Sequence, residues 1–402
     1  MEYSSIEDIR NNSKMQNLVI ISFAVYVFAL YVFSNNIATI RYANIPLAVF
    51  IFLSGVQFLL SGKVFMNYAI IQVFFFAFFC VLSFIWAIDI QYASTRIFTV
   101  VQLFVLVFLS YQVFHNIKGS YALLDILFYA GIGLCVYSVV VYTPSGILET
   151  ITTSERLGAL IGNENLVARN FAVTAVVGFH YMITRRNLLS IILTPLSVIL
   201  ILATKSRSGI SLMVVGFLIL LYYSFGKKYK LRFVILLSLI ALIVNFLGQQ
   251  EWLSQVSSRV KAVSESLITG SVSDASTKFR FQLLRHGWES FKEHPAVGFG
   301  VGASYVLTMG TYYHNNYIQL LVECGLLGFL LYYSIHIYLL RGLLAKLKED
   351  SVAIVLFSLV ILSLIYDFST SSYYDKLTYV FFSMSATVLS TNNVRTTYHK
   401  CR

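Results

Sequence analysis

The chain has 402 residues, of which 58% are hydrophobic, 16% aromatic and only 12% charged. Soluble globular domains carry about 25% charged residues, so this composition excludes an ordinary soluble enzyme. With 4 prolines and 22 glycines the chain is also neither collagen-like nor of low complexity. The formal net charge of +11 would suit nucleic-acid binding in a soluble protein, but in a membrane protein it first indicates which side of the bilayer the basic residues face. We therefore expect a polytopic helical membrane protein and no nucleic-acid partner.

Twelve apolar runs come close to the roughly 20 residues that a bilayer-spanning helix needs. In chain order they cover residues 17–34, 43–60, 67–88, 97–115, 121–142, 166–183, 188–204, 209–224, 231–248, 313–340, 352–366 and 376–390. The first run is too long for the core of a signal peptide, and no small-residue cleavage site follows it, so we expect it to remain as a span. The predicted fold class is all-α, with about 12 transmembrane helices and one long external loop.

The basic residues predict the orientation of these spans. An even number of spans places both termini on one side, and 16 of the 29 Lys and Arg residues fall on that side. Because positive charge concentrates on the cytoplasmic side of the membrane, we expect both termini in the cytoplasm. The chain then divides into helices one to nine at 1–248, an external loop at 249–312, and helices ten to twelve with a cytoplasmic tail at 313–402.

The predicted external loop is far longer than a passive connector and contains an amphipathic segment. Its apolar residues recur on one helical face, at Phe281, Leu284, Trp288 and Phe291. Its charged residues occupy the opposite face, at Lys278, Arg285, Glu289 and Lys292. We expect a helix that lies at the outer membrane–water boundary. Alternating glycines at 298, 300 and 302 then favour a tight turn of exposed backbone, a weak indication of phosphate binding.

Basic residues at the outer ends of two spans indicate an anionic ligand. Short outer loops are poor in positive charge as a rule, yet Lys205 and Arg207 lie in one hairpin between two spans. Arg169 lies about one turn inside the sixth run, where a charge is costly unless it faces a cavity or a partner. The alternatives are that Lys205 and Arg207 extend to lipid headgroups, and that Arg169 forms a structural ion pair with Glu164 or Glu155.

The start of the tenth run, from Tyr313 to Gly328, holds a cluster of polar residues. Asn316, Gln319 and Glu323 recur at i, i+3 and i+7, so they line one side of a helix and face the bundle interior rather than lipid. We expect Glu323 to be a buried structural carboxylate. His314 stands at the helix start, where the macrodipole disfavours imidazolium and keeps the ring neutral, the state that a general base needs. The alternative is a purely structural histidine.

Several motifs in the second half of the chain resemble those of the O-antigen ligase and polymerase superfamily. They are Thr277-Lys278-Phe279-Arg280 followed by Trp288, Glu293-His294-Pro295-Ala296-Val297-Gly298-Phe299-Gly300, and the stretch from His314 to Gly328. The first half is similar only in its number of spans, in Gly162-Asn163-Glu164-Asn165 and in Lys205-Ser206-Arg207-Ser208-Gly209. In this superfamily a long outer loop before a late span contains an arginine and a histidine.

The resemblance implies a metal-independent, inverting glycosyltransferase without a cofactor, which uses an undecaprenyl-pyrophosphate-linked glycan as donor on the outer face of the cytoplasmic membrane. By position, His314 would deprotonate the acceptor hydroxyl and Arg280 would approach the donor pyrophosphate. Arg207, Arg169 and Lys205 are further candidate pyrophosphate ligands, since fixed cations can stabilise such a leaving group where no metal cluster exists. The expected partners are this donor, a glycan or lipid-linked acceptor, and membrane lipids.

Three alternatives stay open. A divalent-metal transferase would need Asp89, Asp367 and Asp375 to converge from separate loops. Polymerase and ligase differ only in the acceptor, which is a second lipid-linked repeat or else a lipid core, wall polymer or protein. We favour the polymerase because chains of this kind occur in surface-polysaccharide systems. A flippase would have ionisable groups near the bilayer midplane and two related halves, neither of which the sequence indicates.

Overall fold

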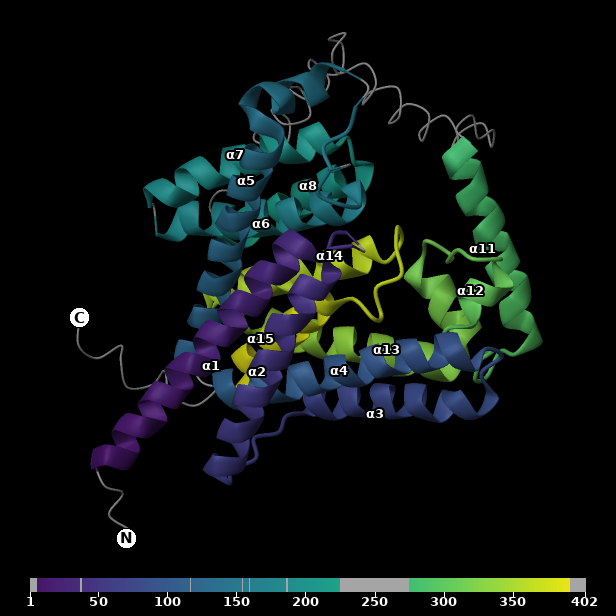
Figure 1. Cartoon of the computed structure of the whole chain (residues 1–402), viewed down its shortest axis with the longest axis horizontal. Helices are drawn as coiled ribbons and strands as arrows, with labels where there is room; N and C mark the ends of the chain where they lie inside the picture. Colours follow the sequence, from purple (N-terminus) through teal and green to yellow (C-terminus); the bar gives the residue numbers. More distant parts are fainter. Residues whose placement is uncertain are drawn as a thin grey trace.

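The computed structural model describes residues 6–36, 38–115, 117–153, 155–158, 160–185, 187–224 and 275–390. Every regular element in these ranges is a helix (Figure 1), as the all-α class predicts. The elements are α1 (Ile6–Phe33), α2 (Ile40–Ser61), α3 (Tyr68–Leu82), η1 (Ser83–Trp86), α4 (Ile90–Phe114), α5 (Ile117–Thr152), α6 (Glu164–Thr184), α7 (Leu188–Thr204), α8 (Arg207–Ser224), α11 (Ala275–Glu293), α12 (Ala303–Leu307), α13 (Asn316–Lys346), α14 (Ser351–Tyr366) and α15 (Lys376–Ser390).

Among the described residues, 8 helices are long and apolar enough to cross a membrane. They belong to α1 to α6, α8 and α13, whereas α7 and α14 are apolar but shorter. Each predicted run coincides with a described helix except the run at 231–248, which lies outside the described residues. The protein is therefore an integral membrane protein, and the number of twelve spans stays a prediction. Within the predicted external loop, residues 249–274 also lie outside the described ranges.

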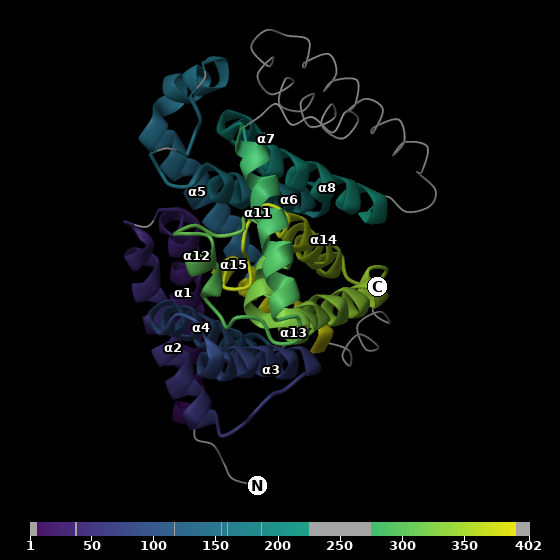
Figure 2. The same cartoon turned by 90° about the vertical axis from the view of Figure 1, so that its right-hand side faces the viewer.

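Two helices form the centre of the bundle. All residues of α15 from Leu377 to Val388 are buried, and α6 is buried from Val167 to Gly178. α6 packs against α7 and α8, and α15 packs against α4, α14 and α13 (Figure 2). The outermost helices expose apolar side chains, for example Leu59 of α2 at 77%, which a bilayer would cover.

One end of the bundle gathers the termini of many helices. There α3 and α14 end, while α4, α13 and α15 begin, and α11 stands across the ends of α3, α4 and α13 (Figure 1). We call this the α11 end. At the opposite end, the Tyr111 hydroxyl of α4 lies 2.5 Å from that of Ser390 at the end of α15. Among the candidate site residues, Arg280 lies on α11, and His314 and Asn316 lie at the start of α13 at this end.

The helix α13 is broken at Gly325, which has φ 61° and ψ −168°. The segment before α12 fills the break, because the N–H groups of Phe299 and Gly300 donate to the carbonyls of Val322 and Glu323 at 2.9 Å each. The N–H groups of Leu326 and Leu327 donate in turn to Pro295 and Ala296, at 2.8 and 3.1 Å. Backbone groups freed inside a membrane protein need such partners, so the break and the segment are one structural unit.

The glycines of this segment correct the sequence prediction. Gly298, Gly300 and Gly302 all have positive φ, but they are buried rather than exposed. A Cβ on Gly298 would collide with the backbone of Glu323, and one on Gly300 with that of Ala87. These residues are glycines because backbones approach closely there, so the described geometry favours packing over phosphate binding.

Candidate active site

Arg280 is placed by the packing of α11 on the start of α13. Leu283 packs with Tyr313 in a small apolar cluster. Gly287 has no room for a Cβ, because Ile318 and Tyr313 lie against it. Arg280 lies one turn before Leu283 on the same helical face, and it is half-buried. The packed face of α11 thus directs Arg280 toward the segment that enters α13.

The packed face of α11 differs from the apolar face predicted from the sequence. The amphipathic helix itself is present, but Phe281 and Trp288 are 54% and 47% exposed. Small or aliphatic residues face the protein instead, namely Leu283, Gly287 and Ser290. The two aromatic side chains are therefore free to contact the membrane boundary, as the sequence led us to expect of this face.

His314 lies just before α13 in a strained conformation. Its φ is 52°, and a non-glycine residue in this left-handed region costs about 1–3 kcal/mol, which the surrounding structure must offset. The next residue, Asn315, caps α13 by accepting the N–H of Ile318 at 3.0 Å. The His314 ring centroid lies 4.0 Å from that of Tyr312. The strained backbone thus holds the imidazole against Tyr312 at the mouth of the helix.

The charge state of His314 follows from its surroundings. Burial, and after it the positive charge of Arg280, lowers the pKa of His314 from 6.5 to about 4. The imidazole is therefore neutral at pH 7, so it can accept a proton. The sequence led us to expect this state from the helix dipole; burial and Arg280 are two causes that the sequence did not reveal.

Asn316 holds the 367–375 loop, which joins α14 to α15. Its side-chain oxygen accepts the N–H groups of Ser372 and Tyr373 at 2.9 and 3.0 Å. Its side-chain nitrogen donates to the Asp367 carboxylate at 3.1 Å, and its backbone N–H donates to the Asp367 carbonyl at 2.7 Å. Asn316 is fully buried, and these hydrogen bonds join the start of α13 to the 367–375 loop.

Glu323 and Gln319 extend this support along the same face of α13. Glu323 is 1% exposed and accepts the N–H of Ser304 at 3.1 Å, the side-chain N–H of Gln319 at 3.2 Å and the hydroxyl of Tyr373. Gln319 accepts the hydroxyl of Ser371. The predicted interior-facing stripe therefore joins α13 to both α12 and the 367–375 loop.

Arg169 is held by an ion pair that the sequence did not identify. Its two terminal nitrogens donate to the two carboxylate oxygens of Asp375 at 2.8 and 3.0 Å, and its guanidinium lies 4.5 Å from the ring centroid of Tyr366. Burial raises the pKa of Asp375, but Arg169 and the hydrogen bonds from Thr378 lower it by more than burial raises it. The pKa of Asp375 therefore lies below its ordinary value. The alternative that the sequence left open was an ion pair with Glu164 or Glu155; the partner of Arg169 in the structure is Asp375.

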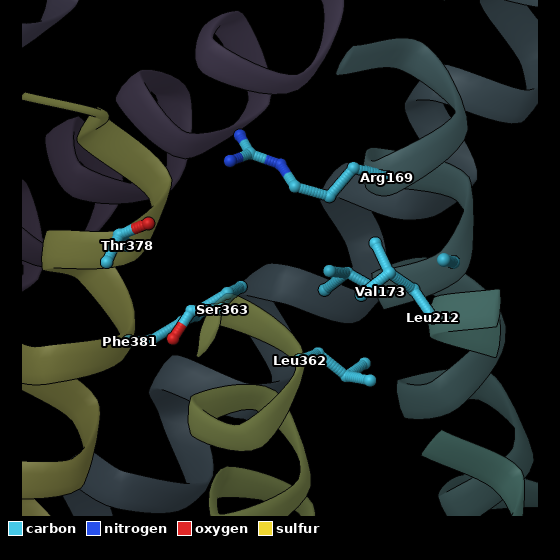
Figure 3. A pocket seen from close by; sticks show the side chains of 8 residues that line it. Arg169, Val173, Leu212, Leu362, Ser363, Thr378 and Phe381 are labelled. Carbon is cyan, nitrogen blue, oxygen red and sulfur yellow. The ribbon is translucent and has the colours of Figure 1, made fainter. Parts of the chain in front are cut away.

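A small cavity borders Arg169 (Figure 3). Arg169 extends from α6 toward α15, where Thr378 lies on the other side of the space. The cavity measures about 10 Å³, which is room for about one water molecule and too little for a phosphate group. A role for Arg169 at a pyrophosphate therefore stays a prediction, and it would require the ion pair with Asp375 to open.

The basic hairpin between α7 and α8 is also largely built into the protein. Lys205 caps α7 with φ 51°, is 6% exposed and donates to the carbonyl of Thr153. Ser206 donates to Asn165 at 2.8 Å, which joins the hairpin to the start of α6. Arg207 begins α8 and is half-buried. Of the two basic residues, Lys205 therefore stabilises the end of α5, and its predicted phosphate contact is untested.

Sequence reasoning missed Arg96. It lies in the second turn of α4, half-buried, and its guanidinium carbon is 4.1 Å from the ring centroid of Tyr374 in the 367–375 loop. Arg96 lies near Tyr312, the tyrosine that contacts His314. The signal in the sequence was a basic residue at the predicted outer end of a span, the same signal that identified Arg169.

The three aspartates of the metal alternative do not form one site. Asp89 caps α4 by accepting the N–H of Tyr92 at 2.9 Å. Asp367 is buried and accepts a hydrogen bond from the Tyr333 hydroxyl at 2.8 Å. Burial raises the pKa of Asp367 to about 7, although its hydrogen bonds act to lower it. Asp375 pairs with Arg169. The described part of the chain contains no group of three or more His, Cys, Asp or Glu residues that could hold a metal ion.

A match to a known family covers α11 and the start of α13. Residues 192–333 match the family described as O-antigen ligase. The matched range contains Arg207, Arg280 and His314, whereas Arg96 and Arg169 precede it. No curated protein matches the chain.

Proposed function

We propose that the chain is a surface-polysaccharide polymerase of the O-antigen ligase and polymerase superfamily. The match of residues 192–333 to the O-antigen ligase family supports this proposal. The protein transfers a glycan from undecaprenyl pyrophosphate to the hydroxyl of another lipid-linked repeat. The reaction takes place on the outer face of the cytoplasmic membrane, inverts the anomeric centre and needs no metal ion.

The observation that supports this proposal is the pairing of a neutral imidazole with a guanidinium. His314 has a pKa of about 4, lowered by burial and by the nearby Arg280. In the proposed reaction, His314 takes the proton of the acceptor hydroxyl as its oxygen attacks the anomeric carbon. The bond from that carbon to the pyrophosphate oxygen breaks, and Arg280 stabilises the negative charge that leaves with it. One displacement gives inversion.

A reconstitution assay tests the polymerase against the ligase. Purified protein in liposomes receives one lipid-linked repeat, with and without a separate acceptor. Products longer than one repeat without any added acceptor support the polymerase. Transfer only when a lipid core, wall polymer or protein is present would identify a ligase. The same assay in EDTA should keep its rate, since the guanidinium groups take the role that a metal ion has at other pyrophosphate leaving groups.

The proposal also places the α11 end outside the cell. Gln282 on α11 and Lys348 between α13 and α14 are both exposed, so single cysteines there, in a background without native cysteines, report the two sides. A membrane-impermeant thiol reagent applied to intact cells should label the cysteine at position 282 and leave the one at 348. The reverse pattern would invert the topology and contradict the proposed location of the reaction.

A further inference from the structure

Arg96 has no ion-pair partner among the described residues, unlike Arg169 and Arg185. Among the described residues, no carboxylate lies within ion-pairing distance of Arg96 or Arg280, whereas Arg169 pairs with Asp375 at 2.8 Å and Arg185 with Asp125 at 2.7 Å. Arg96 contacts the Tyr374 ring through its guanidinium face, at 4.1 Å from the centroid. Stacking of this kind leaves the N–H edge of a guanidinium open for an anion.

Arg96 and Arg280 approach the same tyrosine from different helices. Burial raises the pKa of Tyr312, while Arg280 and Arg96 both act to lower it. Tyr312 in turn contacts the His314 ring at a centroid distance of 4.0 Å. One guanidinium comes from α4 and the other from α11, so the two positive charges converge near Tyr312, and Arg280 also acts on the His314 imidazole.

The buried Glu323 carboxylate acts on Arg96 from beyond ion-pairing distance. Two cations near one tyrosine with no ion-pair partner still repel each other, and an anionic ligand removes that cost. A pyrophosphate has two phosphoryl groups, and each can accept the paired N–H groups of one guanidinium. We propose that Arg96 is a second pyrophosphate contact that acts opposite Arg280, so that the two arginines clamp the leaving group. This inference rests on the proposed function, and it assigns to Arg96 the role that the sequence suggested for Arg169 and Lys205.

The position of Arg96 is fixed by the network that supports the site. The Tyr374 ring packs on that of Tyr373 at a centroid distance of 4.8 Å, and the Tyr373 hydroxyl donates to Glu323. Glu323 also accepts the side-chain N–H of Gln319. The buried carboxylate of α13 thus holds the aromatic surface on which Arg96 rests, and a fixed cation needs no rearrangement when charge develops.

The test measures binding of two lipids, undecaprenyl pyrophosphate and undecaprenyl phosphate, to purified full-length protein in nanodiscs. The variants are Arg96→Gln, Arg96→Lys and Arg280→Gln. Arg41→Gln is the matched control, since Arg41 also lies over a tyrosine, Tyr42 at 5.1 Å, and is exposed. A clamp predicts that Arg96→Gln weakens pyrophosphate binding about tenfold or more and weakens phosphate binding less. Arg96→Lys should restore part of the loss because it keeps the charge without the fork.

A purely structural role for Arg96 gives a different pattern. In that case Arg96→Gln lowers the melting temperature and weakens the binding of both lipids equally, or it binds undecaprenyl pyrophosphate as tightly as Arg41→Gln does. Either result overturns the inference. If Arg96→Gln does not fold, Arg96→Lys decides, because unchanged selectivity for pyrophosphate over phosphate contradicts the clamp. Failure of the proposed function is distinct: the unsubstituted protein would then bind neither lipid and transfer no glycan.

Discussion

The candidate cations of the protein form two groups, which differ in their partners. On the side of α6 to α8, Arg169 is bound on both terminal nitrogens by Asp375, and Lys205 donates to the Thr153 carbonyl. On the side of α4, α11 and α13, Arg96 and Arg280 have no carboxylate in ion-pairing distance among the described residues. Arg169 and Lys205 have hydrogen-bond acceptors within the protein, whereas the proposed clamp needs Arg96 and Arg280 to remain available to a ligand.

The difference shows why a charge near a membrane boundary is not by itself a functional signal. A buried ion pair has to offset the loss of hydration of both partners, and Arg169 achieves this with two hydrogen bonds and a tyrosine ring. Arg280 and Arg96 are only half-buried, so water can still solvate them. The sequence analysis gave Arg169 and Arg280 the same role at a pyrophosphate and did not identify Arg96; the partners of these residues in the structure separate them.

The largest expected effect comes from removing the proposed base. His314→Ala leaves both arginines in place, so the lipid-linked donor should still bind, while transfer should fall by about 10²–10⁴-fold, as for other lost general bases. Single-turnover transfer and donor binding, measured on the same reconstituted protein, separate the two effects. His115→Ala is the control, since His115 stacks on Phe65 at the opposite end of the bundle. Normal polymer from His314→Ala would show that this histidine only shapes the helix start.

The ion pair on the other side should affect stability more than chemistry. Arg169→Ala leaves the Asp375 carboxylate buried without its partner, and breaking a buried pair in this way costs about 3–5 kcal/mol. Arg185→Ala removes a pair with Asp125 that is far more exposed and should cost only about 0–1 kcal/mol. Thermal unfolding in detergent compares the two. If Arg169→Ala unfolds like the unsubstituted protein but loses donor binding, Arg169 belongs with Arg280 and the comparison above is wrong.

Much of the helical frame was predictable because apolar runs of spanning length have few alternatives in a membrane. The breaks inside these helices were not. Gly325 interrupts α13 because the 295–300 segment enters the gap and supplies hydrogen bonds. The helix propensity of the residues around Gly325 cannot predict a contact with a segment more than 20 residues away. In α5, Thr143 has φ 59° just before Pro144, and here the proline did mark the end of the predicted span.

The buried polar face of α13 was predictable, and the partners of the buried cations were not. The spacing of Asn316, Gln319 and Glu323 identified one buried face from helical periodicity alone. The pairing of Arg169 with Asp375 joins α6 to the 367–375 loop, which lies far along the chain, and spacing cannot indicate such a contact. Arg96 was missed for the same reason, since its relation to Tyr374 and Tyr312 exists only once α4 packs beside the 367–375 loop.

A glycine substitution tests whether the broken helix positions the proposed site. Gly298 has φ +70° and no room for a Cβ against the Glu323 backbone, so Gly298→Ala should cost about 1–3 kcal/mol in strain and reduce transfer. Gly55→Ala is the control, because nothing lies within 4 Å of a Cβ there and no positive φ opposes it. Melting temperature and transfer rate should fall together in Gly298→Ala only. Unchanged transfer despite lower stability would mean that the break does not shape the site.

The smallest effect concerns pH and follows from the pKa of His314, about 4, which burial and then Arg280 depress from 6.5. Because a base acts when deprotonated, kcat/KM should be level near neutral pH and fall as pH decreases through about 4. A bound pyrophosphate stabilises the imidazolium, so the acidic fall of kcat should lie at higher pH than that of kcat/KM. Arg280→Gln removes the smaller cause, so its kcat/KM fall should move upward without reaching 6.5. Profiles measured with one donor preparation cancel the titration of the donor itself. If the fall of kcat/KM at low pH stays at the same pH in Arg280→Gln, Arg280 does not act on His314. The proposed chemistry would then lack the electrostatic coupling between these two residues.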